Sequence, residues 1–310
     1  MTNGLPNGPI VVGVDGSPTS RDAVRWAAHE ADAHGAPLLL VSSVSPGGIG
    51  MSSPFTDDLR ISGERAVEDA VALAAAEIPG GTVDTRTELS QSTPVNALLE
   101  HSRTARTIVL GTRGLGEFTG GLVGSVTSAL VRHAHCPVAV IPGWPHPGEP
   151  PVDGPVLVGV DGTAASEPAV AAAFEEASLH GAELVAVHAW SDRDLSIGSP
   201  FDPSAGTSRL PWLTTEAAER AVLAESLAGW QEKYPDVAVR PIVVQDRPVR
   251  NLLMRGNGAR LIVVGNRGRG GFESMTLGST STALLHTVTC PLLVVRSAPG
   301  DRSPGVSRPA

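Results

Sequence analysis

Residues 108–127 read IVLGTRGLGEFTGGLVGSVT, and the interpretation of the whole chain starts from this stretch. Its first three residues are large and apolar, and Ile108 and Val109 are β-branched, which predicts a buried strand. A glycine-rich segment follows, and Gly124-Ser125 stands where a helix is expected to begin. A second stretch, residues 261–281, reads LIVVGNRGRGGFESMTLGSTS and has the same organisation. The chain therefore contains two copies of a strand, a glycine-rich loop and a helix.

The glycines keep the same spacing in both copies. Each copy has Gly-x2-Gly at the strand end, then nine residues, then Gly-Ser, and the matching positions lie 154 residues apart: Gly111, Gly114, Gly124 and Ser125 correspond to Gly265, Gly268, Gly278 and Ser279. Glycine lets the main chain approach a ligand closely. The first amides of a helix are unpaired and carry about half a positive charge. The pattern is typical of a phosphate cradle and predicts a nucleotide site in each copy.

The repetition extends beyond these loops. Residues 9–17 read PIVVGVDGS and residues 155–163 read PVLVGVDGT, with an offset of 146 positions. We therefore expect two homologous domains joined by a stiff, proline-rich connector. The expected organisation is a first domain at 1–143, a linker at 144–154, a second domain at 155–298 and a disordered tail at 299–310.

Apolar strands that alternate with helices predict an α/β fold with a parallel sheet covered on both faces. Right-handed crossovers make each sheet doubly wound, so ligands bind beyond the carboxyl ends of its strands. Between the second strand and the second helix of the first copy, we expect a loop at 45–58 and helix at 64–78. The expected strands are 10–14, 38–44, 83–89, 107–110 and 138–141, then 156–160, 183–189, 238–244, 261–264 and 292–295.

Two better-known phosphate loops do not match. A Walker loop needs Gly-Lys-Ser/Thr, and the single lysine of the chain, Lys233, lies far from both stretches. The dinucleotide fingerprint follows a first strand, whereas this motif follows the fourth. Without a lysine, the phosphate charge calls for a divalent ion, and we expect Mg²⁺. Arg113 and Arg267 share one loop position and either contact phosphate or lie in solvent.

Other side chains have both structural and functional interpretations. Asp15 and Asp161 end the first strand of each copy, where a carboxylate caps the following turn or holds a base or ribose. The hydroxyls of Ser125 and Thr127 are expected to bind phosphate oxygens. His133, His135 and Cys136 resemble a metal cluster but lack a matching partner set, so no metal site is predicted. We find no motif for a nucleophile with its base.

Composition limits the partners. The net charge of −9 argues against nucleic acid or an anionic membrane as the main partner. No apolar run is long enough to cross a bilayer, and the first residues lack the features of a signal peptide, so we expect a cytoplasmic protein. The two cysteines occupy the same position in the two copies and are expected to be buried and unpaired.

The chain resembles the universal stress protein family over nearly its whole length. The marks are VGVDGS at 12–17, the spaced glycines that end in Gly124-Ser125, and CPVAVI at 136–141, each with a second-copy counterpart. The resemblance implies two tandem Rossmann-like, doubly wound parallel sheets of five strands in the order 3-2-1-4-5. It also implies a homodimer formed through the fifth strands.

By the same resemblance, ATP is the expected ligand, with adenine near Asp15 and phosphates on the glycine loops. The expected first-copy residues are Gly13, Val14, Asp15, Ser43, Leu110, Gly111, Thr112, Arg113, Gly114, Gly124, Ser125, Val126 and Thr127. The expected second-copy residues are Gly159, Val160, Asp161, Ala189, Val264, Gly265, Asn266, Arg267, Gly268, Gly278, Ser279, Thr280 and Ser281.

These features favour an ATP-binding stress or dormancy switch that is read by a regulatory protein partner not identified by the sequence. One alternative is a slow ATPase or nucleotidyl-transfer enzyme, although only Glu117 and Glu273 are acidic residues of the loops that could orient a water. We expect weak ATP hydrolysis at most. Another alternative is a nucleotide-free dimerisation platform.

Overall fold

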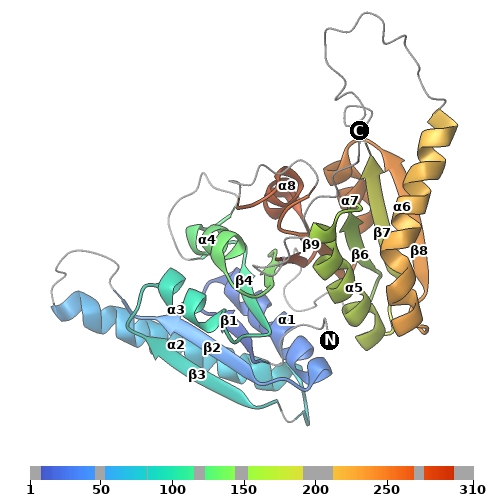
Figure 1. Cartoon of the computed structure of the whole chain (residues 1–310). Helices are drawn as coiled ribbons and strands as arrows, with labels where there is room; N and C mark the ends of the chain where they lie inside the picture. Colours follow the sequence, from blue (N-terminus) through green and yellow to red (C-terminus); the bar gives the residue numbers. More distant parts are fainter. Residues whose placement is uncertain are drawn as a thin grey trace, which may run out of the picture.

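The computed structural model of the chain is shown in Figure 1. It describes residues 8–45, 53–81, 83–114, 123–143, 153–190, 212–268 and 276–296. The expected linker up to residue 152, the C-terminal tail, and Glu117 and Glu273 with the loop segments that carry them lie outside the described residues.

The two repeats have the same order of elements. The first contains β1 (Ile10–Gly13), α1 (Pro18–His34), β2 (Leu38–Ser43), α2 (Ser53–Glu77), β3 (Thr85–Ser90), α3 (Pro94–His101), β4 (Thr107–Gly111), α4 (Ser125–His133) and β5 (Val138–Ile141). The second contains β6 (Val156–Val160), the 3-10 helix η1 (Ala164–Ser166), α5 (Glu167–Leu179), β7 (Leu184–Trp190), α6 (Trp212–Lys233), β8 (Val239–Gln245), α7 (Pro248–Gly256), β9 (Leu261–Gly265), α8 (Ser279–Thr287) and β10 (Leu292–Val295).

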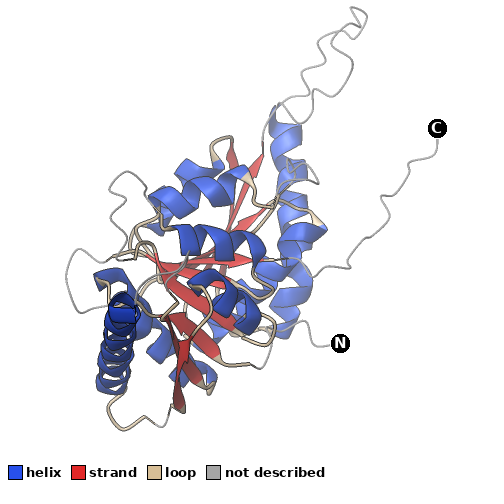
Figure 2. Cartoon of the chain, turned by 90° about the vertical axis from the view of Figure 1, so that its left-hand side faces the viewer, coloured by secondary structure: helices blue, strands red, loops and turns tan. Residues whose placement is uncertain are grey.

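The sheet confirms the predicted α/β class and strand order. The strands run β3-β2-β1-β4-β5 in the first repeat and β8-β7-β6-β9-β10 in the second, and all pairs within a repeat are parallel. Helices cover both faces (Figure 2). The first and last residues of the predicted strands differ from the observed ones by two positions or fewer. Such agreement is expected because continuous apolar runs mark strands that are buried on both faces.

One predicted loop is partly wrong. Residues 45–58 were expected to be irregular, but α2 begins at Ser53 and continues to Glu77. The helix therefore starts about three turns before the expected residue 64. Ser and Pro near the start of this segment are typical of loops, and they are also common in the first turn of a helix, so composition did not separate the two. The extra turns place Leu59 and Ser62 beside the functional site described below.

Local signals in the sequence mark the start and the end of α1. The Ser17 hydroxyl accepts a hydrogen bond from the Ser20 amide at 3.2 Å, and Pro18 occupies the first turn. Gly35 ends the helix in a left-handed conformation with φ 58°. A serine cap at one end and a glycine at the other fix the length of this helix.

The two repeats share one ten-stranded sheet, because β5 and β10 pair with each other. Their pairing is antiparallel and places Leu293 opposite Ala139. The resemblance implied that fifth strands join two chains, whereas here they join two repeats of one chain. The other edge of each strand pairs with β4 or β9, so neither edge is left for a second copy. Homodimerisation itself stays a prediction.

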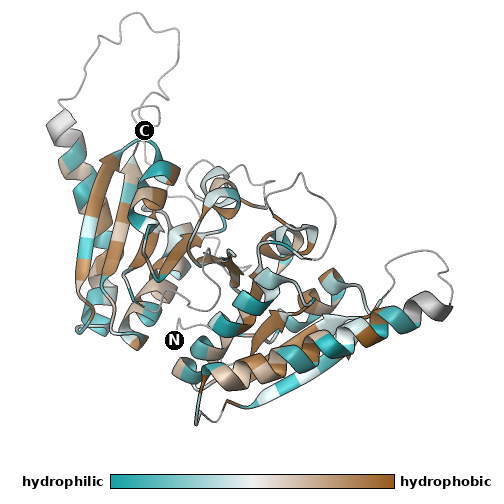
Figure 3. Cartoon of the chain, turned by 180° about the vertical axis from the view of Figure 1, so that it is seen from behind, coloured by the Kyte–Doolittle hydropathy of each residue, from teal (hydrophilic) through white to brown (hydrophobic). Residues whose placement is uncertain are grey.

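Further contacts hold the repeats together. Arg296, which follows β10, donates to the carbonyl oxygens of Arg132 and Ala134 at 2.6 and 3.1 Å, where α4 ends. Arg106 of the first repeat forms an ion pair with Glu175 of the second. The apolar layer on each face of the sheet also contains side chains from both repeats. Figure 3 shows the hydrophobic colours concentrated on the strands. The core is therefore continuous across the join.

The first prediction concerns this join. Leu293 is 1% exposed, and Leu293→Ala removes its contacts across β5 and β10. We expect the free energy of unfolding to fall by about 2–5 kcal/mol, as measured by urea denaturation. Met254→Ala is the control because Met254 is 60% exposed. An equal loss in both variants would contradict the role of the join.

Candidate functional site

A cavity of about 630 Å³ lies at the carboxyl ends of the first-repeat strands. It is bounded by the ends of β1, β2 and β4 and by α2, α3 and α4, so it occupies the position that a doubly wound sheet predicts for a ligand. Its described lining is Gly13, Val14, Asp15, Ser20, Val41, Ser42, Ser43, Leu59, Ser62, Gly63, Ala66, Pro94, Ala97, Leu98, Leu110, Gly111, Arg113, Gly114, Val123, Gly124, Ser125, Val126 and Thr127.

Nearly all of the predicted first-repeat residues line this cavity. The exception is Thr112, whose main chain builds the loop: its amide donates to the Ile141 carbonyl at 3.0 Å, and its carbonyl accepts from the Gly124 amide at 2.7 Å. The second bond joins the start of the glycine loop to its end. The loop therefore closes on itself at the base of α4.

Gly111 and Gly114 occupy places where a side chain would collide. A Cβ on Gly111 would lie 2.7 Å from the main-chain carbon and oxygen of Thr19. A Cβ on Gly114 would overlap the Asp15 carboxylate. The glycines therefore allow the loop to pack against α1 and Asp15.

Hydroxyl groups hold the loop from the other side. Ser17 and Thr19, at the start of α1, both donate from their side chains to the Arg113 carbonyl, and the Ser17 bond is 3.3 Å long. The Arg113 side chain is exposed and reaches the cavity lining. Its position is compatible with a contact to a phosphate at the mouth of the cavity.

The start of α4 supplies main-chain donors. Gly124 is its N-cap and provides no side-chain hydrogen bond, and the first helical bond runs from the Ser128 amide to the Gly124 carbonyl at 3.0 Å. The preceding amides, those of Ser125 and Val126, belong to residues that line the cavity. These amides and the helix dipole favour an anion at this end.

The expected role of the Thr127 hydroxyl needs correction. This side chain is buried, and its hydroxyl donates to the Gly111 carbonyl at 2.9 Å. Ser281 makes the same bond to Gly265 at 2.6 Å in the second repeat. Both hydroxyls tie the last carbonyl of a strand to the following helix, so their protons are not directed at a ligand. Ser125 is exposed and keeps the predicted freedom.

The two aspartates cap the turn that follows the first strand of each repeat. Asp15 Oδ1 accepts from the Ser17 amide at 3.0 Å, and Asp161 Oδ1 accepts from the Thr163 amide and hydroxyl at 2.9 and 2.7 Å. Asp161 Oδ2 is buried, and no described residue gives it a hydrogen bond. A buried carboxylate oxygen without a donor is an acceptor for a ligand hydroxyl or amine.

The other end of the cavity is apolar, and the sequence predicted only part of its wall. Val41, Ala66, Leu98 and Leu110 line it, and Ser43 stands at the end of β2, where its hydroxyl donates to the Ser92 carbonyl at 2.6 Å. Leu110 and Ser43 were expected, but the other three have the spacing of ordinary core residues. Only the meeting of α2, α3 and β2 shows that they border a cavity.

The second repeat reproduces the loop geometry. A Cβ on Gly268 would lie 2.9 Å from Asp161 Oδ2, which matches the contact between Gly114 and Asp15. The Gly278 amide donates to the Asn266 carbonyl at 2.7 Å, just as Gly124 bonds Thr112. The remaining predicted residues lie at the same strand and helix ends, namely Gly159, Val160, Ala189, Val264, Gly265, Arg267, Ser279, Thr280 and Ser281.

The repeats differ at the end of the second strand. His188 stands 146 positions after Ser42, which lines the first-repeat cavity. The His188 ring is fully buried, and its nitrogens lie 2.7 Å from the Val160 carbonyl and 2.7 Å from Glu219 Oε2. This ring ties β6 to α6. The two sites therefore share a main-chain frame but have different walls.

The cysteines are as the sequence predicts. Cys136 and Cys290 are both buried and free. Burial raises the pKa of each thiol to about 12, so both stay protonated and are unsuited to bind a metal or attack a substrate. His133 and His135 lie beside Cys136 in the sequence, but both are exposed.

These features define a class: a tandem α/β protein with doubly wound sheets and a glycine-lined cavity at their carboxyl edge. The model of the universal stress protein family matches residues 6–142 and 154–296. The chain belongs to the universal stress protein family.

Full-length relatives support this assignment. A universal stress protein of Mycobacterium tuberculosis strain H37Rv is 40% identical over 308 residues, which cover 96% of this chain and 99% of the relative. A second one from that strain is 42% identical over 298 residues, which cover 93% and 97%. The crystal structure of a universal stress protein from Archaeoglobus fulgidus has a TM-score of 0.69 at 18% identity and covers 96% of this chain and 99% of its own, which supports the fold alone.

Among the described residues, every helix is too short or too polar to span a bilayer.

The second prediction tests the close packing at Gly111. Gly111→Ala places a methyl group against the Thr19 main chain and should lower the free energy of unfolding by about 1–3 kcal/mol. Gly124→Ala is the matched control, because the nearest atom to its new Cβ is 3.6 Å away. Denaturation midpoints of the two variants measure the difference. Equal midpoints would contradict the prediction, because they would show that the loop shifts enough to accommodate a methyl group at position 111.

Proposed function

We propose that the protein is a nucleotide-dependent regulator that binds ATP in the first-repeat cavity and in the matching site of the second repeat. The observation that carries this proposal is the cavity of about 630 Å³, which has an apolar end and a helix N-terminus at the other. Its volume lies within the usual range for small-molecule sites.

The two ends suit the two parts of the ligand. Val41, Ala66 and Leu98 form an apolar wall for a flat adenine ring, and Asp15 and Ser43 stand at its border. The α4 amides and the Gly111–Gly114 segment suit the phosphates. Family membership supports the same placement.

A phosphate-binding loop without lysine leaves much of the negative charge of the phosphates unneutralised. Arg113 is the cation among the described lining residues, and a helix N-terminus contributes at most about 2 kcal/mol. We therefore propose that ATP binds together with Mg²⁺, which the phosphate oxygens and water would ligate. The ion would supply the charge that the main chain cannot.

Regulation is a better fit to this site than fast hydrolysis. Asp15 is the carboxylate among the described lining residues, and its Oδ1 is occupied by the Ser17 amide. An attacking water needs an acceptor that is placed to orient it, and the one carboxylate of the described lining also has to hold the turn after β1. We propose that bound ATP orders the glycine loops and that a protein partner recognises this state.

The third prediction assigns binding to each repeat. Gly124 and Gly278 have ordinary extended backbones, and the nearest atoms to a new Cβ lie at 3.6 Å for Gly124 and at 3.5 Å for Gly278, which is ordinary van der Waals contact. Leucine at either position should therefore be tolerated by the fold but should fill the phosphate end. By equilibrium dialysis with labelled ATP and Mg²⁺, we expect two equivalents in the natural chain, one in each single variant, and none in the double variant.

The outcomes separate the parts of the proposal. Absence of retained nucleotide at millimolar ATP would refute it. A stoichiometry of one that is unchanged by Gly278→Leu would restrict binding to the first repeat. ATP turnover well above background by purified protein, abolished by Gly124→Leu, would support the enzyme alternative instead.

A further inference from the structure

A glutamate and a histidine recur near the C-terminal ends of α1 and α5. Residues 30–36 read EADAHGA and residues 176–182 read EASLHGA, with the same offset of 146 that relates Asp15 to Asp161. In each segment the glutamate and the histidine are four residues apart, so they lie on one face of the helix. The duplication therefore gives each repeat the same Glu–His pair.

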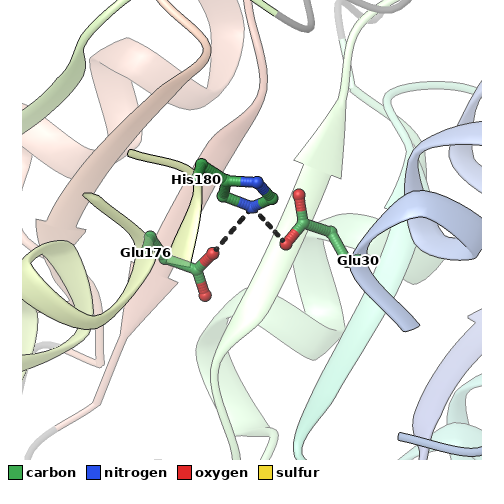
Figure 4. A group of neighbouring side chains, drawn as sticks. All are labelled: Glu30, Glu176 and His180. Carbon is green, nitrogen blue, oxygen red and sulfur yellow. Dashed lines mark hydrogen bonds and ion pairs between the residues drawn. The ribbon is translucent and has the colours of Figure 1, made fainter. Parts of the chain in front are cut away.

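The two pairs meet across the join between the repeats. His180 Nε2 lies 3.1 Å from Glu30 Oε2, and His34 Nε2 lies 3.1 Å from Glu176 Oε1. Within each helix, the corresponding distances are 3.7 Å for His34 to Glu30 and 3.6 Å for His180 to Glu176. Figure 4 shows His180 between the two carboxylates, which approach it from different helices. The four side chains form one group, which we call the Glu–His cluster.

The cluster is closed to solvent. The side chains of Glu30, Glu176, His34 and His180 are 4, 6, 7 and 10% exposed. Burial and repulsion from Glu176 raise the pKa of Glu30. Burial alone would lower the pKa of His180, but the neighbouring carboxylates of Glu176 and Glu30 outweigh this effect and raise it to about 9. The two buried carboxylates thus favour a positively charged group between them.

One oxygen of the cluster lacks a hydrogen bond. Glu176 Oε1 accepts from His34, whereas Oε2 is buried and no described residue gives it a hydrogen bond. Oε2 lies on the side of His180, at 3.6 Å from Nε2. Buried acceptors are normally paired, so this oxygen points to a missing ligand.

The spacing of the ligand atoms suits a metal ion. One atom from each of Glu30, Glu176 and His180 lies within 4.8 Å of the others. Zinc binds nitrogen and oxygen at about 2.0–2.2 Å, so two ligands of a tetrahedral ion stand about 3.4 Å apart. The observed separations of 3.1 and 3.6 Å around His180 bracket this value. Small side-chain rotations would bring the three groups to one centre.

We propose that Glu30, Glu176 and His180 bind one divalent transition-metal ion of the zinc class, which links the two repeats. An imidazole together with carboxylates suits zinc better than Mg²⁺ or Ca²⁺, which prefer oxygen ligands. His34 has a positioning role: it holds Glu176 through Oε1 and leaves Oε2 for the ion, as outer-shell partners of metal sites do. Water would fill the fourth position of the ion.

The experiment uses the full chain, stripped with a chelator and titrated with Zn²⁺ against a chromophoric competitor. We expect one high-affinity equivalent per chain in the natural protein. Glu176→Gln keeps the size of the side chain but removes its charge, and it should weaken zinc binding by more than about tenfold. His101→Gln is the matched control, because it breaks another His–Glu pair, 3.0 Å from Glu88, outside the cluster, and it should leave the affinity unchanged.

Two further measurements test whether the cluster itself is the site. Cobalt in place of zinc should give the visible absorption of a four-coordinate ion in the natural chain and none in His180→Gln. Zinc should raise the thermal midpoint of the natural chain but not that of Glu176→Gln, and circular dichroism without metal shows whether each variant is folded.

The proposal fails if the stripped natural chain takes up no zinc in excess metal, or if folded Glu176→Gln binds as tightly as the natural chain. Equal loss of zinc in Glu176→Gln and His101→Gln would also overturn it, since binding would then come from surface histidines. In each of these cases the Glu–His cluster is a network held by protons alone. Nucleotide binding is measured separately, so this proposal and the proposed function stand or fall independently.

Discussion

The antiparallel pairing of β5 with β10 determines which parts of the two repeats lie against each other. A strand edge in water presents unpaired amides and carbonyls, and each repeat has such an edge at its fifth strand. Because these edges pair within one chain, the sheet becomes continuous and both apolar layers extend through the join. The same pairing brings α1 and α5 together. The Glu–His cluster therefore forms because the two five-stranded halves of the sheet are joined through β5 and β10.

The nucleotide site depends on a different constraint, the close approach of main chain to main chain. Gly111 must pass the Thr19 backbone, and Gly114 must pass Asp15, before the loop can return to Gly124 and bond Thr112. Each of these approaches excludes a Cβ or leaves room for a ligand where a side chain would be. The site is thus built largely from groups that every residue carries, and the sequence contributes by omitting side chains.

This distinction explains how much could be predicted from the sequence. Apolar runs such as 108–110 and the repeated glycines predict which segments are strands and at which edge the cavity opens, because these follow from period and spacing, whereas the strand order was implied only by the resemblance to a known family. The start of α2 at Ser53 was missed, since Ser and Pro occur both in loops and in first helical turns. The hydrogen bond of the Thr127 hydroxyl to Gly111 was missed because it depends on the side-chain rotamer, which sequence spacing does not determine. Ala66 and Leu98 were missed because a residue that borders a cavity has the same pattern as one in a core.

The Glu–His cluster is beyond sequence reasoning for a further reason. Within one repeat, Glu30 and His34 are only a helical pair near a C-terminus, where the helix dipole favours a histidine. Their contacts with Glu176 and His180 cross 142 or more positions and depend on the edge-to-edge joining of the repeats through β5 and β10. Because the repeats are duplicates and are joined through β5 and β10, like residues of α1 and α5 meet, and two carboxylates come close together in a buried space. Such a pair is stable only if positive charge is supplied between the carboxylates, and His34 and His180 occupy that position as proton carriers or as partners of an ion. The pairing of the two repeats thus brings Glu30 and Glu176 together, and these carboxylates need a positive charge between them that neither repeat needs by itself.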